Sequence, residues 1–170
     1  MKKTILIIGG LLVSVALIFV AGNLTSKNDV IVKEKQQSNG EKTFEIQETG
    51  AAPVEEEYSM KMSEEEIQNA IHVMSHQKVE AEDKWGFVPI TSERIEQLIA
   101  VIEKNEYREQ YLYLGILNGW KNNDFSNVDE DHNDIWKLQG GNIGKARGIL
   151  TPEEEKAYIE KHYDIKETDY

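Results

Sequence analysis

Two of the four histidines of this chain stand four residues apart, a spacing that suits a metal site on a helix. In a predicted helix, His72 and His76 project from the same side and could each donate a ring nitrogen to zinc or copper. Val73 follows the first histidine, where the zinc-protease motif has a glutamate as its base. A complete site would need a third ligand from His132, His162 or a carboxylate. We favour the simpler interpretation of two surface histidines, because both point away from the apolar stripe of their helix.

His132 is the second histidine of interest, because a predicted helix places it beside apolar residues. It shares a helical face with Val128 and Ile135, so its ring should be at least half buried and should need a hydrogen-bond partner. A structural histidine is the interpretation that we favour. The alternative is a metal ligand or catalytic base, and His76 with His132 would then serve a metal-dependent enzyme.

Two further patterns near His132 suggest ligands. Residues 129–133 match the start of a calcium-binding loop, but Asp134 and Gly140 replace its required glycine and glutamate, so calcium is not expected.

Lys145 and Arg147 form a local basic pair in an acidic chain and are a candidate polar or anion site for a carboxylate or phosphate. Pairing with the chain's own glutamates is the explanation that we favour. We expect no cofactor.

The composition excludes several classes of function. The 170 residues carry a formal net charge of −12 and give a pI of about 4.8, which opposes the phosphate contacts of nucleic-acid binding. The absence of cysteine excludes disulfides, thiolate zinc sites and a cysteine nucleophile.

Residues 4–22 carry no charged side chain and follow two lysines. As a helix they would span about 28 Å, close to the hydrocarbon thickness of a bilayer. We expect a single-pass signal-anchor over residues 1–22 that holds the chain in the cell membrane, with the C-terminal domain outside the cytoplasm. The alternative is a signal peptide that is cleaved near Gly22, which would release a secreted protein. The expected partners are the membrane, through residues 4–22, and a protein at the cell envelope.

Residues 23–57 are polar and poor in large apolar side chains. Such a composition buries too little to offset the entropy of ordering, so we expect a disordered polar tether. Val30–Val32 and Thr43–Ile46 are short strand-like islands that could pair as a hairpin, but the tether is the interpretation that we favour.

Residues 58–170 are predicted to form a helical extracytoplasmic domain. Ser63, Thr91 or Ser92, and Thr151 are typical helix N-caps, each followed by an amphipathic pattern. Two further helices are expected over residues 107–120 and 126–138. The first of these should be the most buried element, with Tyr111 among its packed side chains. The predicted fold class is therefore all-α, a small bundle of four to five helices behind an N-terminal transmembrane helix and a flexible tether.

The short motifs of this domain follow one another in a recognisable order. They are Met74–Val79, Lys84–Gly86, Trp120 with Asp124–Ser126, Asp131–Asn133 with Trp136, and Gln139–Gly141 with Gly144–Ala146. In this order they resemble a family of domains of unknown function from Gram-positive bacteria of the Bacillus type. The resemblance covers about residues 63–160 and implies an anchored protein at the outer face of the membrane, with no established activity. His76 and His132 match its motif positions, whereas His72 does not.

From these observations we expect a membrane-anchored extracytoplasmic domain of unknown biochemical activity, acting as a non-catalytic binding or regulatory module. The alternative is an exported metal-dependent or cell-envelope-modifying enzyme that uses His76 and His132.

Overall fold

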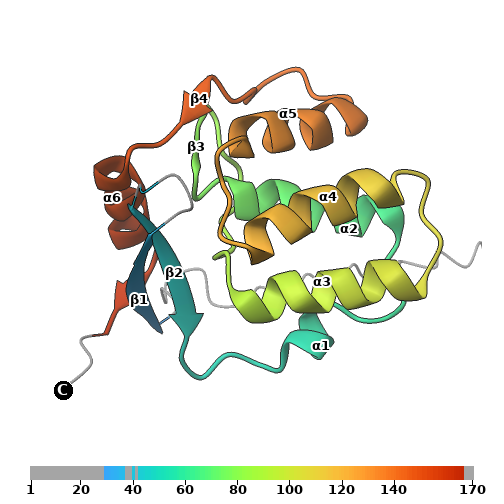
Figure 1. The fold of residues 1–170 in the computed structure, drawn as a ribbon, viewed down its shortest axis with the longest axis horizontal. Helices are drawn as coiled ribbons and strands as arrows, with labels where there is room; N and C mark the ends of the chain where they lie inside the picture. Colours follow the sequence, from blue (N-terminus) through green and yellow to red (C-terminus); the bar gives the residue numbers. More distant parts are fainter. Residues whose placement is uncertain (1–28, 37–39, 41, 167–170) are drawn as a thin grey trace, which may run out of the picture.

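The computed structural model describes residues 29–36, 40 and 42–166 of the chain (Figure 1). In these residues the chain forms six helices and five strands. The helices are α1 Val54–Glu57, α2 Glu64–Ser75, α3 Ser92–Lys104, α4 Gln110–Lys121, α5 Val128–Leu138 and α6 Pro152–His162. The strands are β1 Asp29–Gln36, β2 Lys42–Glu48, β3 Val79–Glu80, β4 Gly148–Ile149 and β5 Asp164–Ile165.

The prediction of an all-α bundle is wrong, because the described residues form a mixed α/β fold. One sheet has the strand order β2-β1-β5, and a second pairs β3 with β4. The membrane segment expected over residues 4–22 lies outside the described residues. Among the helices that the structure describes, none has both the length and the apolar character needed to cross a bilayer.

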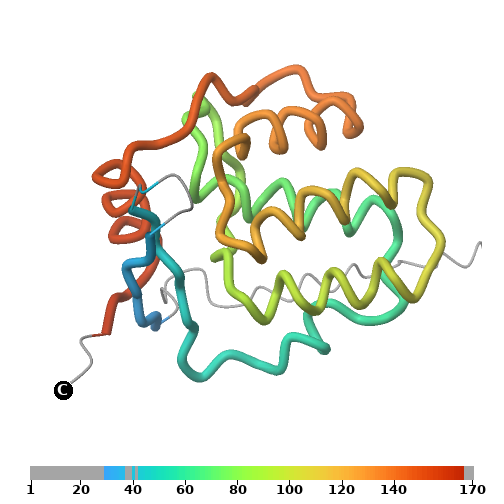
Figure 2. Tube along the Cα trace, in the orientation of Figure 1, coloured from blue at the N-terminus to red at the C-terminus, as the bar shows by residue number. Residues whose placement is uncertain are grey.

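The hairpin of β1 and β2 occupies much of the segment that the sequence predicts to be a tether. Its strands are antiparallel, and β5 from the far end of the chain adds to β1 in parallel (Figure 2). Val30 and Ile46 are fully buried against Ile159 and Tyr163, which α6 and its C-terminal end supply. The strands are ordered because α6 covers their apolar side, and a local composition argument cannot include that distant partner.

The predicted helix caps are confirmed. Ser63 and Thr151 each accept a hydrogen bond from the backbone three residues on, and Glu66 and Glu154 return it, so both ends have a complete capping box. Thr91 accepts from the backbone of α3 in the same way. The glutamate runs of α2 and α6 occupy first turns, where the helix dipole favours negative charge.

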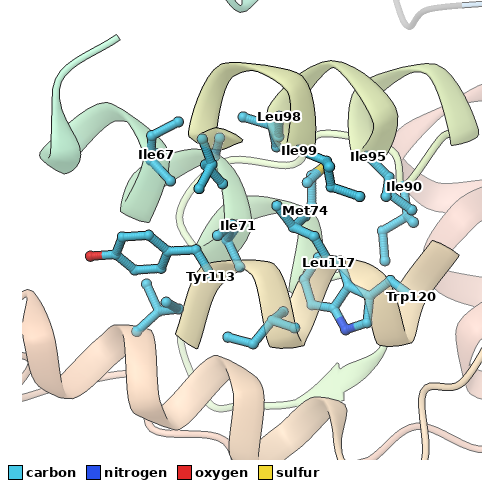
Figure 3. Packing of buried hydrophobic residues seen from close by; sticks show 14 of the residues in the cluster. Ile67, Ile71, Met74, Ile90, Ile95, Leu98, Ile99, Tyr113, Leu117 and Trp120 are labelled. Atoms are coloured by element: carbon cyan, nitrogen blue, oxygen red, sulfur yellow. The ribbon is translucent and has the colours of Figure 1, made fainter. Parts of the chain in front are cut away.

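The main core lies between α2, α3 and α4, whose apolar side chains meet in Figure 3. Ile71 and Met74 of α2 pack with Leu98 of α3 and Leu117 of α4, and all four are fully buried. Tyr111 departs from the prediction, because it is 91% exposed. It stands two residues before the buried Tyr113, and two residues turn a helix by about 200°, so the two rings point to opposite sides.

A buried ion pair connects this core to the hairpin and α6. The ammonium of Lys78, just after α2, contacts the carboxylate of Glu155 in α6, and both side chains are almost fully buried. Lys78 also donates to the hydroxyl of Thr43 and to the carbonyl of Phe44, 3.3 Å away, in β2. The Glu155 carboxylate accepts a second hydrogen bond of 2.8 Å from Gln77. Three elements that are distant in sequence therefore meet at one charge pair.

The substitution Glu155→Ala is expected to lower the free energy of unfolding by about 3–5 kcal/mol, because it leaves the buried Lys78 charge without its partner. Urea unfolding followed by circular dichroism measures this loss. The matched control is Glu96→Ala, which removes an exposed carboxylate 3.2 Å from Lys121 and should cost at most about 1 kcal/mol. Equal losses in the two variants would contradict the importance of the buried pair.

Candidate metal centre

Three histidines converge where α5 packs against the C-terminal end of α2. One ring nitrogen from each of His72, His76 and His132 lies within 4.8 Å of the other two. Their ring centres are 4.5 Å apart for His72 and His132, 5.0 Å for His72 and His76, and 5.6 Å for His76 and His132. The expectation of two surface histidines on α2 therefore fails: His76 is 3% exposed and His72 is partly buried, because α5 covers that face. His132 is fully buried, as its helical face predicted.

Each of the three rings has an oxygen acceptor at its Nδ1 atom. For His76 it is the carbonyl of Gly86, 3.0 Å away, and for His132 it is the side-chain oxygen of Asn133, at 3.3 Å. For His72 it is the side-chain oxygen of Gln139. An acceptor at Nδ1 requires a hydrogen there in the neutral ring, which leaves Nε2 with its lone pair free. This arrangement matches the hydrogen-bonding shell that orients histidine ligands in metal sites.

The backbone fixes which atom of the Asn133 amide faces His132. Its oxygen accepts from the amide of Ala146 at 2.9 Å, and its nitrogen donates to the carbonyl of the same residue at 3.0 Å. The amide therefore has one satisfied orientation. The backbone of Ala146, which follows the glycine turn after α5, therefore fixes the tautomer of His132 through the Asn133 side chain.

The Nε2 atom of His132 is fully buried and has no hydrogen-bond partner. A buried polar atom without a partner loses its hydration and gains nothing in return, so native structures rarely keep one without a reason. The adjacent imidazoles do not donate to it. A group that accepts the lone pair of Nε2, such as a metal ion, would give this atom a partner.

All three histidines are neutral near pH 7, the form in which an imidazole binds a metal. Burial lowers the pKa of His76 to about 4, helped by the neighbouring His72 and His132. Burial also lowers the pKa of His132 to about 4. For His72 burial lowers the pKa as well, and the hydrogen bond to Gln139 opposes it.

The spacing of the rings fits a shared metal ion. A zinc ion lies about 2.0–2.1 Å from each ligating nitrogen, hence about 3.2 Å from each ring centre, and tetrahedral angles then separate the ring centres by about 5 Å. The observed separations of 4.5 to 5.6 Å bracket that value. Within the described part of the chain, these three histidines are the group of side chains close enough to share a metal. The cluster thus offers three ring nitrogens that could bind one metal ion.

A cavity of about 320 Å³ opens beside His72 and His76. Its other walls are Trp85, Trp136, Asp83 and the turn over residues 140–144. Trp85 is 73% exposed, so a large aromatic face is available at the rim. This cavity gives the histidine cluster an opening to the surroundings on the side away from His132.

The turn over residues 140–144 is held tightly against the cavity wall. A Cβ atom on Gly141 would lie 2.3 Å from the Trp136 ring, and one on Gly144 would lie 2.6 Å from the carbonyl of Asp83. The indole nitrogen of Trp136 donates to the carbonyl of Ile143 at 2.7 Å. The glycines therefore permit close packing of this turn against Trp136 and Asp83.

Lys84, Trp85 and Gly86 are three consecutive residues that contact the end of α2, the cavity and the His76 ring. Lys84 donates from its ammonium to the carbonyls of His76 and Val79, at 3.0 and 2.9 Å, and so caps the end of α2. Trp85 lines the cavity, and the carbonyl of Gly86 orients His76. The sequence predicts none of these roles.

The remaining predicted site residues lie elsewhere. Lys145 and Arg147 are exposed and do not line the cavity, and the guanidinium of Arg147 lies 3.9 Å from the carboxylate of Glu80. The sequence favoured pairing with the chain's own glutamates for both residues, and the structure gives this one contact for Arg147. The ring of His162 stands over Phe87, with ring centres 4.4 Å apart, and is not a member of the three-histidine group.

Comparison with known proteins gives one match. The family described as "Family of unknown function (DUF6241)" matches residues 71–160. The matched segment contains all three clustered histidines and the glycine turn, whereas β1 and β2 lie before it. The match bears out a family without known function, while the Bacillus-type source and the membrane segment stay predictions. No curated protein and no solved structure shows significant similarity to the chain.

The metal-free chain should lose stability as the pH falls from about 6.5 towards 4. In this range the unfolded histidines bind protons, whereas His76 and His132 in the folded state do not until about pH 4, so protons favour unfolding. Asp131 acts in the opposite direction, because burial raises its pKa to about 6. Two histidines outweigh one carboxylate, and the net loss should reach several kcal/mol.

Urea unfolding of the chelator-treated chain at pH 7, 5.5 and 4.5 measures this dependence. Replacing His132 with Phe removes one of the three buried histidines whose pKa is lowered and should make the free energy of unfolding less dependent on pH. His162→Ala, which changes a histidine outside the cluster, should leave the pH dependence of the free energy of unfolding unchanged. A free energy of unfolding that stays constant or rises as the pH falls would contradict the buried neutral cluster.

Gly141→Ala should lower the free energy of unfolding by about 1–3 kcal/mol, because the new methyl group overlaps the Trp136 ring. The control Gly115→Ala adds a methyl group to α4 with no atom within 4 Å. It should raise stability by about 0.5–1 kcal/mol through helix propensity. Thermal unfolding compares the two, and a Gly141→Ala chain as stable as the control would show that the turn is not tightly packed.

Proposed function

We propose that this chain, which belongs to the DUF6241 family, binds a divalent transition-metal ion through His72, His76 and His132. The observation that carries the proposal is the Nε2 atom of His132. It is buried without a partner in a ring whose centre lies 4.5 Å from that of His72. A bound metal ion gives this atom the partner that the protein does not provide.

Zinc matches the three ligands and is the metal that we propose for the test. Imidazole nitrogens suit zinc, copper, nickel and iron, whereas calcium and magnesium prefer oxygen. Three histidines with their Nδ1 hydrogens held by oxygen acceptors form a tetrahedral zinc site with one position left over. The chain has no cysteine, so a thiolate cannot compete for the ion.

The proposal changes the role of His72. The sequence favoured a non-catalytic binding module, with a metal-dependent enzyme based on His76 and His132 as the alternative. The geometry supports a metal-binding module in which His72 is the third ligand, positioned by the four-residue helical spacing and by Gln139. Two ligands from α2 and one from α5 tie the ends of these helices together.

The test is zinc titration of the purified full chain after treatment with a chelator. Calorimetry and elemental analysis should find one zinc per chain, and an excess of about 100 times the dissociation constant should add about 2.7 kcal/mol to the free energy of unfolding.

His72→Ala is the informative variant, because its ring is partly exposed and the fold should tolerate its loss. It should lower zinc affinity at least about 100-fold. His162→Ala, a histidine outside the cluster, is the matched control and should bind zinc as the unaltered chain does. A folded chain that binds no zinc, or a His72→Ala chain that binds it undiminished, would overturn the proposal.

A further inference from the structure

We infer that the metal centre keeps one coordination position open to the adjacent cavity, and that this position takes a small, flat anion of the aromatic carboxylate class. The inference rests on the proposed metal function and names the class of ligand that the same site would accept.

The open position follows from the number and placement of the ligands. Three histidines occupy three of the four tetrahedral positions, and no fourth His, Asp or Glu of the described residues joins their group. His132 closes the inner side, because it is fully buried. The cavity lies against His72 and His76, so the unoccupied position has space on that side.

The size and walls of the cavity indicate a small molecule with an apolar body. Its volume of about 320 Å³ lies at the lower end of the range of ligand pockets. Trp85 and Ile143 line it while remaining 73% and 53% exposed, so both present apolar surface that a ligand could cover. A flat ring stacks well on such an indole face.

The cavity is built in advance of any ligand. Trp136 is fixed by its hydrogen bond to Ile143, and Gly141 lies directly against the Trp136 ring. A Cβ atom on Gly144 would lie 2.6 Å from the carbonyl of Asp83, so this part of the turn is also closely packed. A wall that is already ordered costs little entropy when a ligand binds, which favours a small and rigid ligand.

The charge of the site favours an anion. Three neutral imidazoles leave a divalent ion with its full double positive charge. Of the described residues that line the cavity, Asp83 is the acidic one, and no lysine or arginine lines it. The divalent ion and the ammonium of Lys84, which lies 3.0 Å from the carbonyl of His76, together outweigh the Asp83 carboxylate, so the site is positive and favours a ligand that carries a carboxylate.

The experiment uses the full chain loaded with Co²⁺, whose visible absorption reports its ligands, whereas zinc is silent. Benzoate is the probe and acetate is the comparison, because the two share a carboxylate and differ in the ring. Benzoate should change the cobalt spectrum saturably and bind at least about 10-fold more tightly than acetate.

Trp85→Ala tests the aromatic wall. The Trp85 side chain is 73% exposed, so its removal should leave the fold intact. It should bring benzoate affinity down to that of acetate while the chain still binds one cobalt ion. Tyr111→Ala, which removes an exposed ring from α4, is the matched control and should leave benzoate affinity unchanged.

The outcomes separate the two proposals. Cobalt that binds one to one without any spectral response to benzoate or acetate would overturn the open position and leave the metal site standing. Equal affinity for benzoate and acetate, or no effect of Trp85→Ala, would overturn the aromatic ligand. A chain that binds neither cobalt nor zinc would overturn both proposals.

Discussion

The packing of α5 across the polar face of α2 is the contact on which the rest of the site depends. An ordinary surface helix buries one face, but α2 buries its apolar side against α3 and α4 and its histidine side against α5. This second contact removes water from the imidazoles, which keeps them neutral. It also brings the third ring within reach of the other two.

The sequence predicted the helical part of the fold well, because helix signals are local. The capping boxes at Ser63 and Thr151 and the apolar stripe of α2 are each contained in a few consecutive residues. The sequence offered the hairpin only as the less favoured alternative, because its buried residues, Val30 and Ile46, pack on a helix more than a hundred positions away. No local pattern carries that information, and two short strands alone are not stable in water.

The candidate site could be predicted only in part, for a related reason. The four-residue spacing identified His72 and His76 as a pair, and the helical face identified His132 as buried. Histidine does not contribute to a hydropathy pattern, so the second buried face of α2 had no signature and the pair was assigned to the surface. The oxygens that fix the tautomers, from Gly86 and Gln139, belong to turns whose path only the folded chain reveals.

The turn formed by Lys84, Trp85 and Gly86 joins the three-histidine cluster and the cavity in one short segment. Lys84 holds the end of α2, Trp85 faces the cavity, and Gly86 orients a histidine ring. Any molecule that binds against the Trp85 indole would therefore restrain the backbone whose Gly86 carbonyl orients His76. Thermodynamic linkage makes such a coupling reciprocal: any change that a molecule in the cavity makes to the ion affinity of the cluster is matched by an equal change that the ion makes to the affinity of the cavity.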